Sequence, residues 1–229
     1  MTRSANARAA GVAYLLYIAV AFPSMLISGR ATAGDDMAAR LASMARHAGD
    51  VRLAAVLGLI GCWCALVLAV TLYAVTRDED RDVAMLGLTC RVAEGIMGAV
   101  GIPATFALLA LASGASAPAT EATQAVGALV LRHTSTVAAW FFAVGSTAFS
   151  WLLLRGRMIP VPLAWLGVGA SALLVITLPL QMGAVLPGQL ASLMWLPMAA
   201  FEIPLGLWFV AKGVRPLTER LETDLGRAR

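Results

Sequence analysis

Three charged side chains lie inside segments that are otherwise apolar enough to cross a membrane. Arg91 and Glu94 belong to the apolar run 83–112, and Glu202 belongs to the run 190–211. A charge at the bilayer centre costs roughly 2.5–3.5 kcal/mol on insertion scales, so such residues usually face a partner or a cavity. These three residues are therefore the first candidates for chemistry in this chain.

Their spacing places the three residues at one level. With a rise of about 1.5 Å per residue, Arg91 lies about 12 Å and Glu94 about 17 Å from the start of their helix. Glu202 lies about 15 Å from the end of the last helix, which runs the opposite way. Arg91 and Glu94 are three residues apart and share a helix face. The sequence thus predicts an Arg91–Glu94–Glu202 cluster near the membrane midplane.

This cluster suits three kinds of function. One arginine cannot neutralise two buried carboxylates, so one glutamate is expected to be protonated or otherwise compensated. The cluster could bind a small or lipid-like ligand, in a protein related to transport. A protonated Glu94 or Glu202 could instead serve as the general acid of an intramembrane enzyme acting on a lipid or isoprenoid. The third alternative is a structural or regulatory module, in which an Arg–Glu bridge holds two helices together.

Six apolar runs are long enough to be membrane helices, which need roughly 20 residues. None shows the alternation of a barrel strand. The predicted fold is an all-α bundle of six transmembrane helices, and a short amphipathic segment within 29–50 resembles a helix lying at the membrane surface. The predicted spans are residues 9–28, 53–76, 83–112, 135–154, 159–182 and 190–211. Residues 121–132 are expected to extend the fourth span beyond the membrane.

The basic residues give the predicted orientation, because they gather on the cytoplasmic side. An N-terminus inside puts eleven of the 17 basic residues on the inner side and five on the outer side, with Arg91 within the membrane. Both termini are then cytoplasmic. Residues 1–214 form a single membrane domain, and residues 215–229 form a charged cytoplasmic tail. A homo-oligomer is compatible with such a small transporter.

The composition agrees with a membrane protein. Of its 229 residues, 60% are hydrophobic and only 13% are charged, whereas soluble domains carry roughly 25% charged residues. The net charge of +4 does not indicate nucleic-acid binding, because the basic residues sit at the ends of apolar segments rather than in a patch. No nucleotide or metalloprotease motif is present, so no cofactor is predicted.

Glycines and prolines shape the two helices of the cluster. Pro197 and Pro204 flank Glu202, and each proline is expected to kink its helix. Broken helices at midplane recur where backbone lines a site. Gly95 and Gly98, with Gly101 at the same spacing, could admit a closely packed neighbour or a ligand, and close packing is the commoner use.

His133 is a further candidate ligand-binding residue at the outer end of the fourth span. A histidine with two glutamates would suit a metal chemically. However, His133 lies about 33 Å above the inner turn at Arg155 in a straight helix, about 15 Å above Glu94. We therefore predict no metal site, and we expect His133 to form hydrogen bonds near the membrane surface.

The chain also resembles the bacterial membrane family known as domain of unknown function 4386, over about residues 5–214. The resemblance rests on ordered segments: residues 11–18, Arg91-Val-Ala-Glu94, His133, residues 156–160 and residues 202–214. In the family, a Glu, a His and a second Glu are typical at the positions of Glu94, His133 and Glu202. The resemblance implies six spans in a bacterial inner membrane, and it implies no activity.

Overall fold

The computed structural model describes residues 2–114, 120–183, 185 and 193–214, apart from the side chains of 123 and 129–135. All regular elements in this part of the chain are helices. They are α1 (Arg3–Ala31), α2 (Met37–Arg46), α3 (Ala48–Thr76), α4 (Arg81–Gly114), α5 (Glu121–Arg155), α6 (Val161–Met182) and α8 (Leu196–Ala211). The all-α prediction is therefore confirmed.

Five helices are long and apolar enough to cross a membrane: α1, α3, α4, the part of α5 from Thr136 to Arg155, and α6. They match the first five predicted spans. The sixth predicted span begins within residues outside the described part, and α8 has only 16 residues. A six-span topology thus stays a prediction. Residues 121–132 continue α5 without a break, as predicted.

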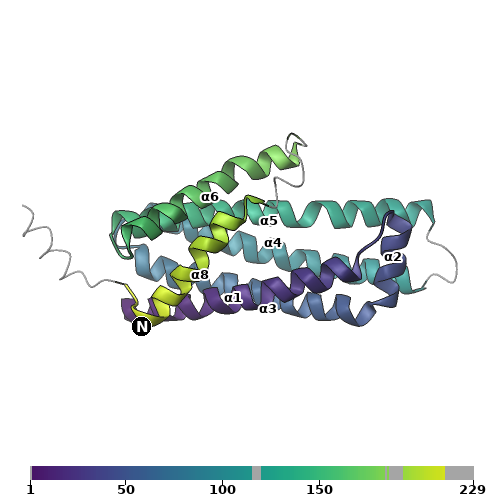
Figure 1. Cartoon of the computed structure of the whole chain (residues 1–229), viewed down its shortest axis with the longest axis horizontal. Helices are drawn as coiled ribbons and strands as arrows, with labels where there is room; N and C mark the ends of the chain where they lie inside the picture. Colours follow the sequence, from purple (N-terminus) through teal and green to yellow (C-terminus); the bar gives the residue numbers. More distant parts are fainter. Residues whose placement is uncertain (1, 115–119, 184, 186–192, 215–229) are drawn as a thin grey trace, which may run out of the picture.

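All the described helices except α2 are arranged as a closed ring. Neighbours pack in the order α1, α3, α4, α5, α6 and α8, and α8 packs back onto α1. Figure 1 shows the helices aligned along the long axis, with α8 reaching from the middle of the bundle to the end that holds the N-terminus. A Cβ on Gly213 would lie 3.2 Å from Ser4 Oγ, so α8 ends beside the start of α1. We call this end of the ring the N-terminal end.

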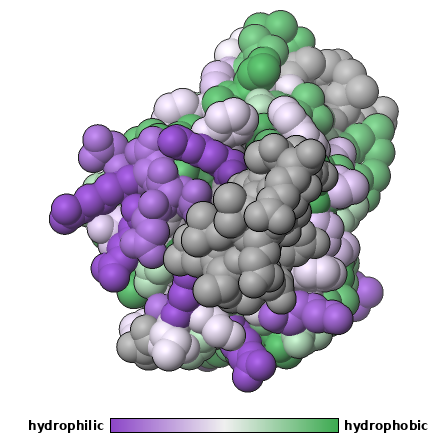
Figure 2. All heavy atoms as spheres, turned by 90° about the vertical axis from the view of Figure 1, so that its left-hand side faces the viewer, coloured by the Kyte–Doolittle hydropathy of each residue, from purple (hydrophilic) through white to green (hydrophobic). Residues whose placement is uncertain are grey.

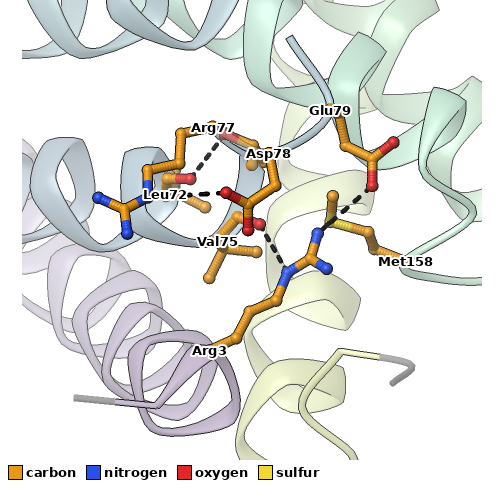
Figure 3. A network of polar contacts seen from close by, with 8 residues as sticks. Arg3, Leu72, Val75, Arg77, Asp78, Glu79 and Met158 are labelled. Carbon is orange, nitrogen blue, oxygen red and sulfur yellow. Dashed lines mark hydrogen bonds and ion pairs between the residues drawn. The ribbon is translucent and has the colours of Figure 1, made fainter. Parts of the chain in front are cut away.

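The N-terminal end is held together by polar contacts. Arg3 Nε donates to Val75 O at 2.8 Å, and Arg3 Nη2 lies 3.5 Å from Glu79 Oε1. The same nitrogen reaches Met158 Sδ, in the α5–α6 turn, at 3.4 Å. Figure 3 shows Arg3 crossing from α1 toward these turns. Arg3 thus joins α1 to the opposite side of the ring.

Charged side chains surround these contacts on the same face. Figure 2 shows hydrophilic side chains gathered on part of this end of the molecule. The exposed charged residues at the two turns and at the end of α8 include Arg77, Asp78, Arg81, Arg155 and Lys212. Arg155 also pairs with Asp80 at 3.2 Å. This is the end that the basic residues predict to be cytoplasmic.

The opposite end is closed by α2. Leu41 and Met44 are fully buried and share an apolar cluster with Leu108 and Leu109 of α4. The helix is separately capped, because Asp36 Oδ1 accepts a hydrogen bond from Ala39 N at 2.7 Å. The amphipathic pattern therefore predicts the helix correctly. Its apolar side faces protein rather than lipid, because the ends of α4 and α5 offer it a covered apolar surface.

Glycines allow close approach at several helix contacts. A Cβ on Gly95 would lie 3.2 Å from Cys62 O, and one on Gly98 would lie 3.0 Å from Cys62 Sγ. These two glycines therefore allow α3 to pack closely against α4. Close packing, rather than room for a ligand, was the commoner of the two uses expected from the sequence. The ring of Phe149 lies against Gly87 in the same way, between α4 and α5.

Candidate functional site

The first part of the candidate site lies on α4, one face of which turns inward. Arg91 exposes none of its surface, and Glu94 exposes 6%. Arg91 Nη1 lies 2.9 Å from Glu94 Oε2. Because the two residues are three apart on one helix, this ion pair lies within α4 and joins no two helices.

Helix α1 supplies a hydrogen bond to the same carboxylate. Tyr17 Oη donates to Glu94 Oε1 at 3.1 Å. Tyr14, three residues earlier on the same face, is 2% exposed and interacts electrostatically with the charges of Arg91, Glu94 and Glu202. Glu94 is thus held through one oxygen by α1 and through the other by Arg91.

Helix α5 fixes the path of the Arg91 side chain. The guanidinium carbon lies 4.8 Å from the centre of the Phe142 ring, within the range of a cation–π contact. A Cβ on Gly145 would lie 3.0 Å from Arg91 Cγ and 3.2 Å from Cδ. The missing side chain of Gly145 therefore makes room for the arginine stem.

Glu202 comes to the same region from α8. A Cβ on Gly11 of α1 would lie 2.8 Å from Gly206 O and from Val210 N, so the two backbones are in direct contact. Glu202 is one turn before Gly206 and therefore shares its face. It exposes 6% of its surface and interacts electrostatically with Arg91 and Glu94. This close crossing of α1 and α8 positions Glu202.

The prolines of α8 act differently from one another. Pro204 lies inside the helix, as expected of a kinking residue, whereas Pro197 lies in the first turn. A first-turn proline costs little, because its N–H would have no partner within the helix anyway. Only Pro204 removes an internal hydrogen bond next to Glu202.

Several polar atoms of the site lack hydrogen-bond partners. Among the described residues, none accepts a hydrogen bond from Arg91 Nε or Nη2, whereas Nη1 faces Glu94 Oε2 at 2.9 Å. Glu202 Oε1 is likewise without a partner there, and no ion pair or hydrogen bond joins Glu202 to Arg91 or Glu94. Buried polar groups are nearly always paired in proteins, and each exception needs an explanation. A polar group of a ligand between α4 and α8 can accept hydrogen bonds from the guanidinium of Arg91 and contact the carboxyl group of Glu202.

His133 is part of α5, but its side chain lies outside the described residues. Its predicted part in ligand binding therefore stays a prediction. Two residues that the sequence analysis did not single out, Tyr14 and Tyr17, also reach the site. Their spacing of three residues was the available signal, because it puts both phenols on one helix face.

Comparison with known proteins bears on the family of the chain. A family model described as a domain of unknown function, DUF4386, matches residues 9–213. No curated protein and no solved structure matches the chain significantly.

Proposed function

Because this chain belongs to the DUF4386 family, whose description assigns no activity, we propose a function from the polar site itself. Arg91, Glu94 and Glu202 form a midplane site that binds a small or lipid-like ligand, in a protein related to transport. The protein is a six-span protein of a bacterial cytoplasmic membrane, with both termini in the cytoplasm. The observation that carries the proposal is the buried guanidinium of Arg91, of which Nε and Nη2 have no hydrogen-bond acceptor among the described residues.

The roles within this site follow from the contacts. Glu94 positions Arg91, because its two oxygens already face Tyr17 and Arg91. Arg91 donates to an oxygen of the ligand, and Glu202 contacts the same polar group from α8. Phe142 and the Tyr14 ring border the charged groups with apolar surface. A ligand with an oxygen-bearing head and an apolar body would fit this combination.

The location of the ion pair favours binding over a structural bridge. A bridge that held α4 to α8 would need contact between Arg91 and Glu202, whereas the described pair lies within α4. A buried ion pair within one helix adds no link between helices, and buried pairs are weak stabilisers in any case. Its burial is better explained if the guanidinium serves a ligand.

A thermal-shift screen tests this function. The purified protein is heated with long-chain carboxylic acids, long-chain alcohols and their short-chain analogues. A ligand at about 100 times its Kd adds about 2.7 kcal/mol to the free energy of unfolding. We expect at least one class to stabilise the wild type and to lose this effect in Glu202→Gln. The matched control is Glu121→Gln, the same change at an exposed position; equal stabilisation of all three proteins would refute a site at Glu202.

A further inference from the structure

The two ends of the helix ring are closed in physically different ways. At the N-terminal end, Arg3 links α1 to α3, to the α3–α4 turn and to the α5–α6 turn, and Arg155 adds a pair with Asp80. At the other end, α2 meets its neighbours through apolar side chains. The polar site lies between these two closures.

Helix α2 makes its described polar contacts within its own segment. Asp36 caps Ala39, Arg40 Nε donates to Gly34 O at 3.1 Å, and the His47 ring bonds Ser43 O at 3.0 Å. In the described part of the chain, no side-chain hydrogen bond or ion pair joins α2 to another helix. The segment can therefore leave the bundle without losing a polar partner.

The apolar contacts of α2 also form a separate unit. Leu41 and Met44 belong to a cluster distinct from the main core, which includes Tyr14, Phe142 and Phe201. Segments with few buried apolar contacts open at lower free energy than the core. Both α1 and α4 contain an internal proline on the α2 side of the polar site, Pro23 and Pro103, where a backbone hydrogen bond is lost.

From these contacts we infer that α2 is a movable plug, whose release opens the polar site to the side of the membrane where α2 lies. The Arg3 contacts keep the N-terminal end closed while α2 moves. This inference rests on the proposed function, because a plug has a function only if a ligand enters or leaves the polar site. Its test does not depend on any ligand.

A reversible disulfide can lock the plug. A Cβ on Gly127 of α5 would lie 3.1 Å from Sδ and 3.5 Å from Cγ of Met37. A cysteine sulfur at residue 37 would take about the position of Met37 Cγ, next to the Cβ of a cysteine at residue 127, and this proximity suits a disulfide. The pair Met37→Cys and Gly127→Cys is made in a protein whose native Cys62, Cys64 and Cys90 are replaced by serine. Tyr17→Cys, beside Glu94, serves as the reporter thiol.

The readout is the rate at which a water-soluble, membrane-impermeant methanethiosulfonate reagent labels the reporter thiol in reconstituted protein. We expect oxidation of the pair to slow labelling at least about tenfold, and reduction to restore it. The matched control carries Met37→Cys without Gly127→Cys, and oxidation should not change its rate. Equal rates in the locked and unlocked protein would overturn the inference, and so would failure of the pair to oxidise.

Hydrogen exchange on the unmodified protein provides a second test, which no folding defect can confound. We expect amides of Met37–Arg46 to exchange together, at least about tenfold faster than amides in the last turns of α3 and α5. Exchange of α2 as slow as that of these turns would contradict a movable plug. A working plug together with a ligand effect that Glu202→Gln leaves unchanged would instead count against the proposed function alone.

Discussion

Replacing Glu94 by methionine should lower the free energy of unfolding by about 3–5 kcal/mol, the usual cost of leaving one partner of a buried ion pair without the other. Arg91 exposes none of its surface, and its nearest charge is Glu94 Oε2 at 2.9 Å. The measurement is reversible unfolding in mixed detergent micelles. It is made in a Glu202→Gln background, because the second carboxylate could otherwise turn toward Arg91.

The control for this prediction removes the cation as well. In the same background, Glu94→Met combined with Arg91→Met should recover most of the lost stability, because an apolar pair of similar size often replaces a buried ion pair without cost. A loss below about 1 kcal/mol for Glu94→Met alone would mean that the charge of Arg91 is compensated elsewhere. Equal losses in the single and double variants would show that packing, not charge, is responsible.

Gly11→Ala is expected to destabilise the fold by about 1–3 kcal/mol, the usual cost of overpacking. The added methyl group would lie 2.8 Å from Gly206 O and Val210 N, which are backbone atoms that no side-chain rotation can move away. The helices α1 and α8 must therefore separate, and Glu202 moves with α8. The same unfolding experiment measures the effect.

Gly58→Ala is the matched control for this crossing. Gly58 also lies within an apolar membrane helix, and nothing comes within 4 Å of a Cβ placed there. Alanine is a better helix former than glycine, so this change should leave stability unchanged or raise it slightly. If Gly11→Ala behaves like Gly58→Ala, the close contact of α1 and α8 does not exist in the folded protein.

The helices of this fold could be predicted from sequence because each crossing segment must be apolar over its whole length. The run 83–112 predicted α4 within two residues at either end. The pairing of Arg91 with Glu94 also followed from their spacing of three. These features depend on local sequence alone.

Features that depend on tertiary packing could not be predicted in the same way. An amphipathic pattern such as that of α2 suits a lipid surface and a protein surface equally, and only the presence of Leu108 and Leu109 decides between them. A tyrosine in a membrane helix usually anchors it at the interface, so the bond from Tyr17 to Glu94 required knowledge that α1 and α4 face each other. The last predicted span began at residue 190, whereas α8 starts at Leu196. Pro197 therefore lies in the first turn of α8, and the apolar run alone did not indicate this.

The central claim, that Arg91 and Glu202 bind a ligand, is tested most directly by native mass spectrometry of the protein released gently from its own membrane. We predict a reproducible adduct on the wild type that is not a membrane phospholipid. It should be lost in Glu202→Gln and kept in Glu121→Gln. Its mass would identify the ligand. A bare or phospholipid-only mass for all three proteins would contradict the claim and would leave the polar cluster with a structural role.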